Sequence, residues 1–313
     1  MSNAHFPLVN NFAPWIKYAF FLIILILVLF IIYNIIIYKY FRNNGNISYD
    51  ILLTNFIHNV SENNYFMNYG LWDNNNDSLL KANENLVNFV FDKSKLLNKK
   101  DLNILDVGCG YGDQDLIWSK KLDPSCKLTA IDISDKQISF AKQKNSTIIF
   151  DICDAMLIDK KYKSSSFDTI ISLESAFHYS DRPKFLNNVN TLLKDNGVFI
   201  ITDIMLKSEN SYKSSVATNI FIKLFSDFLH IPSQNLISSD EWEKQMLSEF
   251  NIIESYDITE QTFKPYYNHF MCEYIKYLNL PCIFSDLLAN FFNSVQPFSY
   301  RVAVLNKRMD NIV

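Results

Sequence analysis

A cluster of glycines directly after an apolar stretch constrains this chain more than any other feature. Residues 104–107 (Ile-Leu-Asp-Val) are predicted to form a short buried strand, and three of the chain's six glycines follow, at Gly108, Gly110 and Gly112. Glycine has no Cβ atom and adopts positive φ angles without strain, so it allows a tight turn that a ligand can approach at the backbone. A helix can start at once over residues 113–121. The sequence therefore predicts a ligand-binding turn between a strand and a helix.

The acidic residues around this turn indicate which ligand it suits. A dinucleotide-binding fingerprint has the spacing G-x-G-x-x-G and presents backbone amides to a pyrophosphate. Here the spacing is G-x-G-x-G, and Asp106, Asp113 and Asp115 frame it. These carboxylates would repel a pyrophosphate, whereas they suit a ligand with an ammonium group. A dinucleotide site and a purely structural turn are the alternatives.

Further predicted strands place polar side chains beyond their carboxyl ends, where open α/β sheets bind ligands. The strand 127–132 ends on Asp132, whose carboxylate can accept both hydroxyls of a ribose or, alternatively, cap the next helix, near whose start Gln137 lies. The strand 167–173 is followed by residues 174–179 (Glu-Ser-Ala-Phe-His-Tyr), which we expect to line the site. The other predicted strands are 147–151, 198–202, 251–258 and 299–305.

An apolar run at residues 20–37 approaches, with its flanks, the roughly 20 residues needed to cross a bilayer. Its one polar residue is Asn34, aromatic residues lie at both ends, and Lys39 and Arg42 follow it. Under the positive-inside rule, this pattern predicts a single-pass membrane protein whose C-terminal side lies in the cytosol. A buried helix of a soluble protein and a cleaved signal peptide are the alternatives.

Composition narrows the class of partners and cofactors. The formal net charge of −4 argues against a dedicated nucleic-acid-binding protein, which would usually be basic. The five cysteines are scattered, without the spacing of metal ligands, so we expect reduced thiols and no metal site. With 49% apolar residues over 313 positions, the chain can bury a large core.

The order of these motifs resembles that of class I S-adenosylmethionine (SAM)-dependent methyltransferases, from about residue 69 to residue 307. The residues that carry the resemblance are Leu105-Asp106-Val107-Gly108-Cys109-Gly110-Tyr111-Gly112, Asp132-Ile133-Ser134 with Gln137, Asp154-Ala155, Ser166-Phe167-Asp168 and Glu174-Ser175-Ala176-Phe177-His178-Tyr179. The likeness is strongest to the small-molecule branch, which includes sterol, tocopherol, squalene, sugar-hydroxyl and cyclopropane methyltransferases.

This resemblance implies an α/β, Rossmann-like fold with a seven-stranded, mostly parallel sheet, an antiparallel final strand and helices on both faces. The chain would divide into an N-terminal segment 1–42, with a transmembrane helix at about 15–40, and a methyltransferase domain 43–313, with a helical lid inserted at about 204–250. SAM is the implied cofactor, with Asp154 accepting from the adenine amino group and Tyr69 helping to close the site. The predicted cofactor-binding residues are Asp106, Gly108, Gly110, Gly112, Asp132, Ile133, Gln137, Asp154, Ala155 and Tyr69.

Two residues after the strand 167–173 are candidates for catalysis. A hydroxyl acceptor loses a proton, which suits His178 as a general base. An alkene acceptor passes through a carbocation, which would call on Glu174 and nearby aromatic rings. The sequence thus predicts a membrane-anchored methyltransferase for the hydroxyl or carbon of a small acceptor that is apolar, amphiphilic or lipid-like. The alternative is a membrane-tethered SAM-binding module without catalysis.

Overall fold

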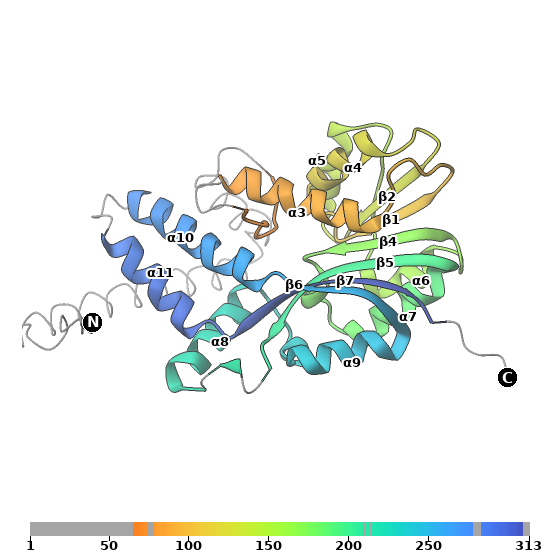
Figure 1. Cartoon of the computed structure of the whole chain (residues 1–313). Helices are drawn as coiled ribbons and strands as arrows, with labels where there is room; N and C mark the ends of the chain where they lie inside the picture. The colour runs from red at the N-terminus through yellow and green to blue at the C-terminus, as the bar shows by residue number, and fades with distance from the viewer. Residues whose placement is uncertain (1–64, 74–77, 209–210, 213, 278–282, 309–313) are drawn as a thin grey trace, which may run out of the picture. The chain divides into compact units, whose positions relative to one another are not determined.

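A seven-stranded sheet with the order β3-β2-β1-β4-β5-β7-β6 runs through the protein (Figure 1). The neighbouring strands from β3 to β5 pair in parallel, and β7 is antiparallel to both β5 and β6. The predicted seven-stranded, mostly parallel Rossmann-like sheet is therefore confirmed. The strands are β1 (Asn103–Val107), β2 (Lys127–Asp132), β3 (Ile149–Ile152), β4 (Phe167–Leu173), β5 (Leu193–Leu206), β6 (Phe250–Asp257) and β7 (Phe298–Lys307).

The computed structural model describes residues 65–73, 78–208, 211–212, 214–277 and 283–308. The predicted transmembrane helix at about 15–40 lies outside these ranges. Within them, no helix has the length and apolar character that a bilayer span requires. The helices are α3 (Leu79–Ser94), α4 (Asp113–Lys121), α5 (Asp135–Lys144), α6 (Ile158–Lys161), α7 (Arg182–Leu192), α8 (Val216–Phe228), α9 (Ser239–Glu249), α10 (Thr259–Tyr277) and α11 (Ile283–Val295).

The central strands are apolar on both sides because helices cover both faces of the sheet. Ile104 of β1 and Ile171 of β4 belong to a core shared with α3, α4 and α5, whereas Leu105 and Ile170 belong to a second core shared with α7 and α9. Such near-continuous apolar strands are typical of parallel sheets buried on both faces. Strand β5 is longer than the predicted 198–202 because β7 pairs with it as far as Leu206.

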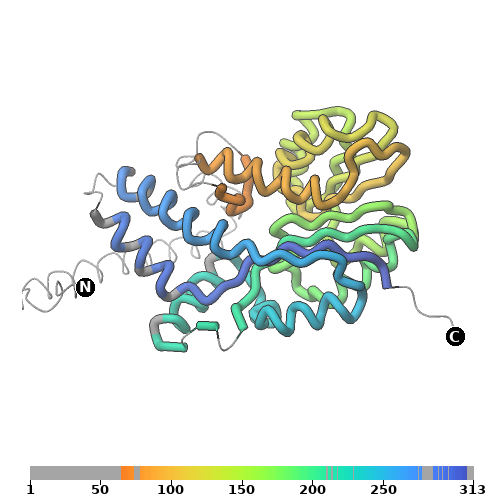
Figure 2. Tube along the Cα trace, in the orientation of Figure 1, coloured from red at the N-terminus to blue at the C-terminus, as the bar shows by residue number. Residues whose placement is uncertain are grey.

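Three helices gather in a layer beside the sheet (Figure 2). Helices α10 and α11 lie between β6 and β7 in the chain and pack against each other, and α11 also contacts α8. Of the predicted lid at about 204–250, only α8 joins this layer, whereas α9 packs against α7, β5 and β6. The role of residues 204–250 as a lid stays a prediction.

A buried ion pair ties α7 and α9 to the end of β5. Arg182 Nε lies 3.2 Å from Asp203 Oδ2, and both side chains are completely buried. Trp242 Nε1 donates a hydrogen bond of 2.7 Å to the same carboxylate oxygen. Burial raises the pKa of Asp203, although Arg182 acts in the opposite direction. Because a buried charge without its partner is costly, this cluster fixes the start of α7 against β5.

We expect Asp203→Ala to lower the free energy of unfolding by about 3–5 kcal/mol, because it leaves the Arg182 guanidinium buried without a counter-charge. Asp227→Ala is the matched control. Asp227 pairs with Lys223 at 3.4 Å on the surface of α8, and we expect a loss of about 1 kcal/mol or less. Urea denaturation of the full chain, followed by circular dichroism, measures both values. Equal losses in the two variants would show that the buried pair is no more important for stability than a surface pair.

Candidate cofactor and acceptor site

The predicted glycine turn lies between β1 and α4, and its three glycines serve different purposes. Gly108, Gly110 and Gly112 have φ angles of 85°, 56° and 77°, in the left-handed region. A Cβ at Gly108 would lie 2.3 Å from Ser175 Cβ, and one at Gly112 would lie 2.7 Å from the Phe150 ring, so both glycines permit close packing. At Gly110, by contrast, the single described atom within 4 Å is a side-chain sulfur, Met67 Sδ at 3.7 Å. Gly110 thus presents bare backbone to a space that a ligand could fill.

Asp132, at the end of β2, lies beside this turn as predicted. Its Oδ2 accepts a hydrogen bond of 3.0 Å from Gly110 N–H, and its Oδ1 accepts one of 2.9 Å from Ser134 N–H. Ser134, not Asp132, caps α5 by accepting from Gln137 N–H. Ser134 therefore has the capping role that was the alternative for Asp132. The Asp132 carboxylate lies at the edge of the turn.

The other predicted residues near β2 and β3 have different surroundings. Gln137 is buried and donates from Nε2 to Met67 Sδ at 3.2 Å, whereas the Ile133 side chain is 70% exposed. Cys153 N–H donates to Asp132 O, which holds the segment after β3 beside β2. There, Asp154 Oδ1 caps a short 3₁₀ helix (Ala155–Leu157) by accepting from Met156 N–H at 2.8 Å, and Ala155 is buried. The adenine contact of Asp154 stays a prediction.

Asp106, a predicted cofactor-binding residue, lies inside the core beneath the turn. It is completely buried, and its Oδ2 accepts a hydrogen bond of 2.6 Å from Gln114 Nε2. Asp115 is also completely buried and interacts with Asp106. Burial raises the pKa of Asp106 to about 7 and that of Asp115 well above its usual range. Because a raised pKa favours the protonated carboxyl, this pair retains a proton at neutral pH.

Residues 65–72, which we call the strap, lie across the turn. Tyr65 contacts the rings of Tyr111 and Phe140, with centroids 5.6 and 4.7 Å away. Lys144 Nζ lies 4.9 Å from the Tyr65 ring centroid and forms an ion pair of 2.6 Å with Asp113. Lys144, the last residue of α5, thus contacts the start of the strap and is itself held by Asp113, the first residue of α4. The residues of the strap before Tyr69 carry no sequence motif that predicts these contacts.

The other end of the strap reaches Glu174, directly after β4. Tyr69 N–H donates to Glu174 Oε1 at 2.8 Å, and Tyr300 Oη of β7 donates to the same oxygen at 2.5 Å. Glu174 has a φ of 51°, unusual for a residue other than glycine, and its own N–H donates to Thr202 Oγ1. Burial raises the pKa of Glu174 to about 8, and the two hydrogen bonds act in the opposite direction.

His178, in the same segment as Glu174, faces different neighbours. It ends a 3₁₀ helix (Ala176–His178), and its ring contacts Phe177 at a centroid distance of 4.2 Å. The backbone of Leu229 and His230, at the end of α8, also contacts the imidazole. Burial, with a smaller contribution from the charge of His230, lowers the pKa of His178 to about 4. His178 is therefore neutral at pH 7.

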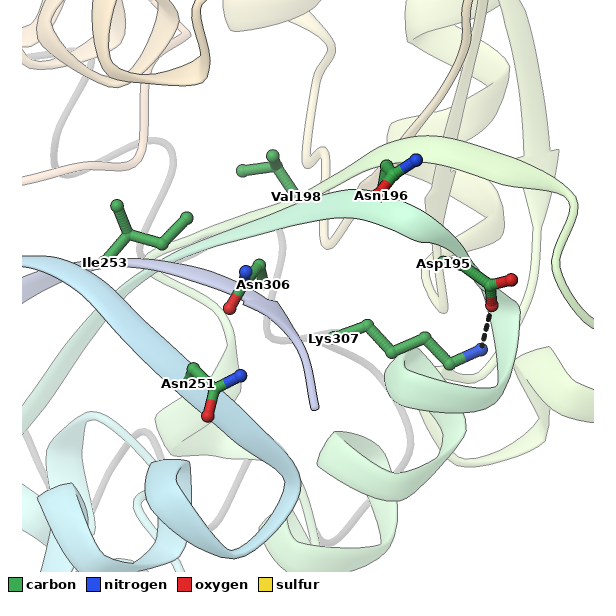
Figure 3. A pocket seen from close by; sticks show the side chains of 7 residues that line it. All are labelled: Asp195, Asn196, Val198, Asn251, Ile253, Asn306 and Lys307. Atoms are coloured by element: carbon green, nitrogen blue, oxygen red, sulfur yellow. Dashed lines mark ion pairs between the residues drawn. The ribbon is translucent and has the colours of Figure 1, made fainter. Parts of the chain in front are cut away.

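A separate pocket lies near the start of β5, and encloses about 310 Å³ (Figure 3). Two of its lining residues form an ion pair, with Lys307 Nζ 3.6 Å from Asp195 Oδ1. The candidate site lies near the other end of β5, where Thr202 accepts a hydrogen bond from Glu174 N–H. The pocket is therefore not part of the candidate site. Its lining consists of Asp195, Asn196, Val198, Asn251, Ile253, Asn306 and Lys307.

Comparison with known proteins agrees with this geometry. Residues 98–252 match the family model of a methyltransferase domain. Erythromycin 3''-O-methyltransferase of Saccharopolyspora erythraea is 27% identical over 152 residues, which are 47% of this chain and 49% of that protein. The chain thus aligns with about half the length of this curated relative. Together, the family match and this relative indicate a methyltransferase domain over this part of the chain.

Solved structures share the fold over a larger part of the chain. A geranyl diphosphate methyltransferase in complex with SAM superposes with a TM-score of 0.61 at 15% identity, covering 78% of this chain and 99% of the other. The [4+2]-cyclase SpnF superposes with a TM-score of 0.63 at 17% identity, covering 83% of this chain and 94% of the other. At these identities, the likeness establishes the fold alone.

The residues present fit SAM as the cofactor. The space at Gly110 and the Asp132 carboxylate at its edge suit a ligand with hydroxyl groups. The other acidic residues that frame the turn in the sequence do not face this space as free carboxylates, because Asp106 and Asp115 are buried and Asp113 is paired with Lys144. The sequence predicted Gly110 and Asp132, whereas Met67, Tyr65 and Tyr300 were not predicted. Their contacts join segments that are far apart in the chain, so no local pattern indicates them.

We expect Gly110→Ala to weaken SAM binding at least about tenfold, because the new Cβ would take up space between the turn and Met67, whose Sδ would lie 3.7 Å from it. The positive φ adds a cost of about 1–2 kcal/mol to folding. Gly197→Ala is the control: its Cβ would meet Lys194 O at 2.8 Å, in β5 and away from the turn. Calorimetric titration of both folded variants with SAM measures the effect. An unchanged dissociation constant for Gly110→Ala would contradict the assignment of this space to the cofactor.

We also expect Lys144→Met to release the demethylated cofactor, S-adenosylhomocysteine, about three- to tenfold faster, because it removes the ion pair and cation–π contacts that hold the strap. Lys161→Met provides the comparison, since Lys161 pairs with Asp151 at 2.7 Å and does not contact the strap. Dissociation rates can be measured by surface plasmon resonance. Equal rates for the two variants would show that the strap does not cover the cofactor.

Proposed function

We propose that this protein is a SAM-dependent methyltransferase that acts on the hydroxyl or carbon of a small, apolar or amphiphilic acceptor. The observation that carries the proposal is the open glycine turn beside Asp132, within a segment that matches a methyltransferase domain. SAM supplies an electrophilic methyl group on a sulfonium. The protein's own contribution is to align the acceptor, exclude water and accept a proton where the acceptor must lose one.

Glu174 is the better proton acceptor of the two predicted catalytic residues. A carboxyl group with a pKa of about 8 is a much stronger base than an imidazole with a pKa of about 4. Glu174 also contacts the strap through Tyr69, so it belongs to the wall of the same site. We assign proton acceptance to Glu174, and we assign His178 the role of a neutral hydrogen-bonding group in the same segment.

Aromatic rings next to Glu174 support an apolar acceptor. The Tyr69 ring lies 4.6 Å from the Tyr266 ring and 5.5 Å from the Phe263 ring, between centroids, and Phe263 lies 6.0 Å from Tyr300. Such rings bind apolar groups and stabilise positive charge that develops during transfer to carbon. Two of the similar proteins are named as methyltransferases of erythromycin and of geranyl diphosphate, which also supports a small-molecule acceptor.

The apolar run at residues 20–37 supports an N-terminal membrane anchor, with the domain on the cytosolic side. An anchored enzyme could take an amphiphilic or lipid-like acceptor directly from the bilayer. Incubation of the full chain with a membrane lipid extract and methyl-labelled SAM tests the proposal, and we expect label in an organic-soluble product. SAM binding without any labelled product would instead favour the non-catalytic, membrane-tethered module.

We expect Glu174→Gln to lower kcat by a factor on the order of 10²–10⁴ while SAM binding is retained. In the unmodified enzyme, kcat/KM should rise as the pH increases through about 8, because only the ionised carboxylate accepts a proton. This rise should be absent in the variant. Glu254→Gln is a matched control, since Glu254 also accepts from a tyrosine, Tyr256, but lies on β6 at the surface. Full activity of Glu174→Gln would exclude Glu174 as the base.

A further inference from the structure

The segment between β4 and α7 is held by a side chain that is distant in sequence. Asn235 is 1% exposed and lies in a short 3₁₀ helix (Ser233–Asn235) between α8 and α9. Its Nδ2 donates two hydrogen bonds, of 3.0 Å to Phe177 O and of 2.7 Å to Tyr179 O. These are the carbonyl groups on either side of His178, so one amide nitrogen fixes the backbone around the imidazole.

The buried ion pair of the fold also contacts the backbone of Asn235. Arg182 Nη2 lies 3.5 Å from Asn235 O, and Arg182 also pairs with Asp203. Next to Asn235, Gln234 Nε2 donates to Ser180 O at 2.7 Å. The segment that follows α8 is therefore joined to the segment that follows β4 by several hydrogen bonds, and β5 supports both through Asp203.

The same part of the chain partly covers His178. The backbone of Leu229 and His230 contacts its imidazole, and His230 is the ionisable group that acts on it electrostatically. His230 has a φ of 52°, as the chain leaves α8 towards Asn235. The chain from 229 to 235 thus covers the imidazole at one end and holds its backbone at the other.

We propose that Asn235 is a positioning residue, which fixes the segment carrying Glu174 and His178 against the end of α8 and so keeps the imidazole partly covered. The inference rests on the proposed function to the extent that this segment forms the acceptor side of the site. Asparagine is required because both hydrogens of one amide nitrogen are donated. Aspartate has the same shape but cannot donate, and its charge would repel both carbonyl oxygens. Alanine would leave two buried carbonyl oxygens without these donors.

The test is an NMR titration of the five histidines in the full chain, with His178 assigned by comparison with His178→Gln. In the unmodified protein, the His178 imidazole should stay neutral until the pH falls to about 4. We expect Asn235→Asp and Asn235→Ala to raise its pKa by at least one unit, with the larger rise in Asn235→Asp, because water enters and the new carboxylate favours the imidazolium. An unchanged His178 titration in these folded variants would overturn the proposal.

Two further variants make the test decisive. Asn188→Ala is the control, because Asn188 is likewise buried and donates from its amide to a backbone carbonyl, Met156 O, without contacting the His178 segment. It should leave the His178 titration unchanged even where it lowers stability. Gln234→Ala changes an exposed residue, so we expect it to fold even in the case that the Asn235 variants fail to fold. We expect it to raise the His178 pKa by less than Asn235→Asp, and no rise in it would also count against the proposal.

Kinetics separate this inference from the proposed function. We expect Asn235→Asp to lower kcat at least tenfold and to leave the dissociation constant of SAM within about twofold, because Asn235 does not contact the turn. The titration needs no methyl transfer. If the variants raise the His178 pKa but the unmodified protein transfers no methyl group, the positioning role is supported and the methyltransferase function is rejected. If the protein is active but the His178 titration does not change in the variants, the methyltransferase function is supported and the positioning role is rejected.

Discussion

The hydrogen bond from Gly110 N–H to the Asp132 carboxylate is the contact on which the candidate site depends. It joins the ends of two parallel strands, since Val107 of β1 pairs with Ile131 of β2, and the N–H groups of Gly108 and Cys109 donate to Ile131 O. The left-handed φ angles of the glycines bring the Gly110 amide to Asp132. Bare backbone and a carboxylate therefore lie side by side where open α/β sheets bind ligands.

Four carboxyl groups around the site differ because their surroundings differ. Asp132 accepts two backbone N–H groups at the edge of the turn. Asp106 and Asp115 are buried together beneath it, so their pKa values are raised, and they retain a proton. Glu174 accepts from Tyr69 N–H and Tyr300 Oη among aromatic rings. The fold thus places one carboxyl group at the edge of the turn, one among aromatic rings and two in the core, where burial favours their protonated forms.

Local patterns predicted much of this architecture. The predicted strands 127–132 and 167–173 and the helix 113–121 agree with β2, β4 and α4. Both strands bury most of their residues, and the helix begins directly after Gly112. The prediction was weaker for the helical layer. Helix α10 begins at Thr259, before the aromatic residues of its sequence, so no apolar pattern marks its start. Strand β5 extends beyond its predicted end because β7, far along the chain, pairs with it.

The sequence by itself determined the glycine turn, the apolar strands and the polar residues at their carboxyl ends, because each follows from the conformational freedom or hydropathy of neighbouring residues. Only the tertiary structure decided which of these side chains meet. Tyr300 reaches Glu174 from 126 positions away, Met67 lies against Gln137, and Asn235 holds the carbonyl groups around His178. Such contacts depend on the packing of the strap and the helical layer around the sheet, which no local pattern of residues encodes.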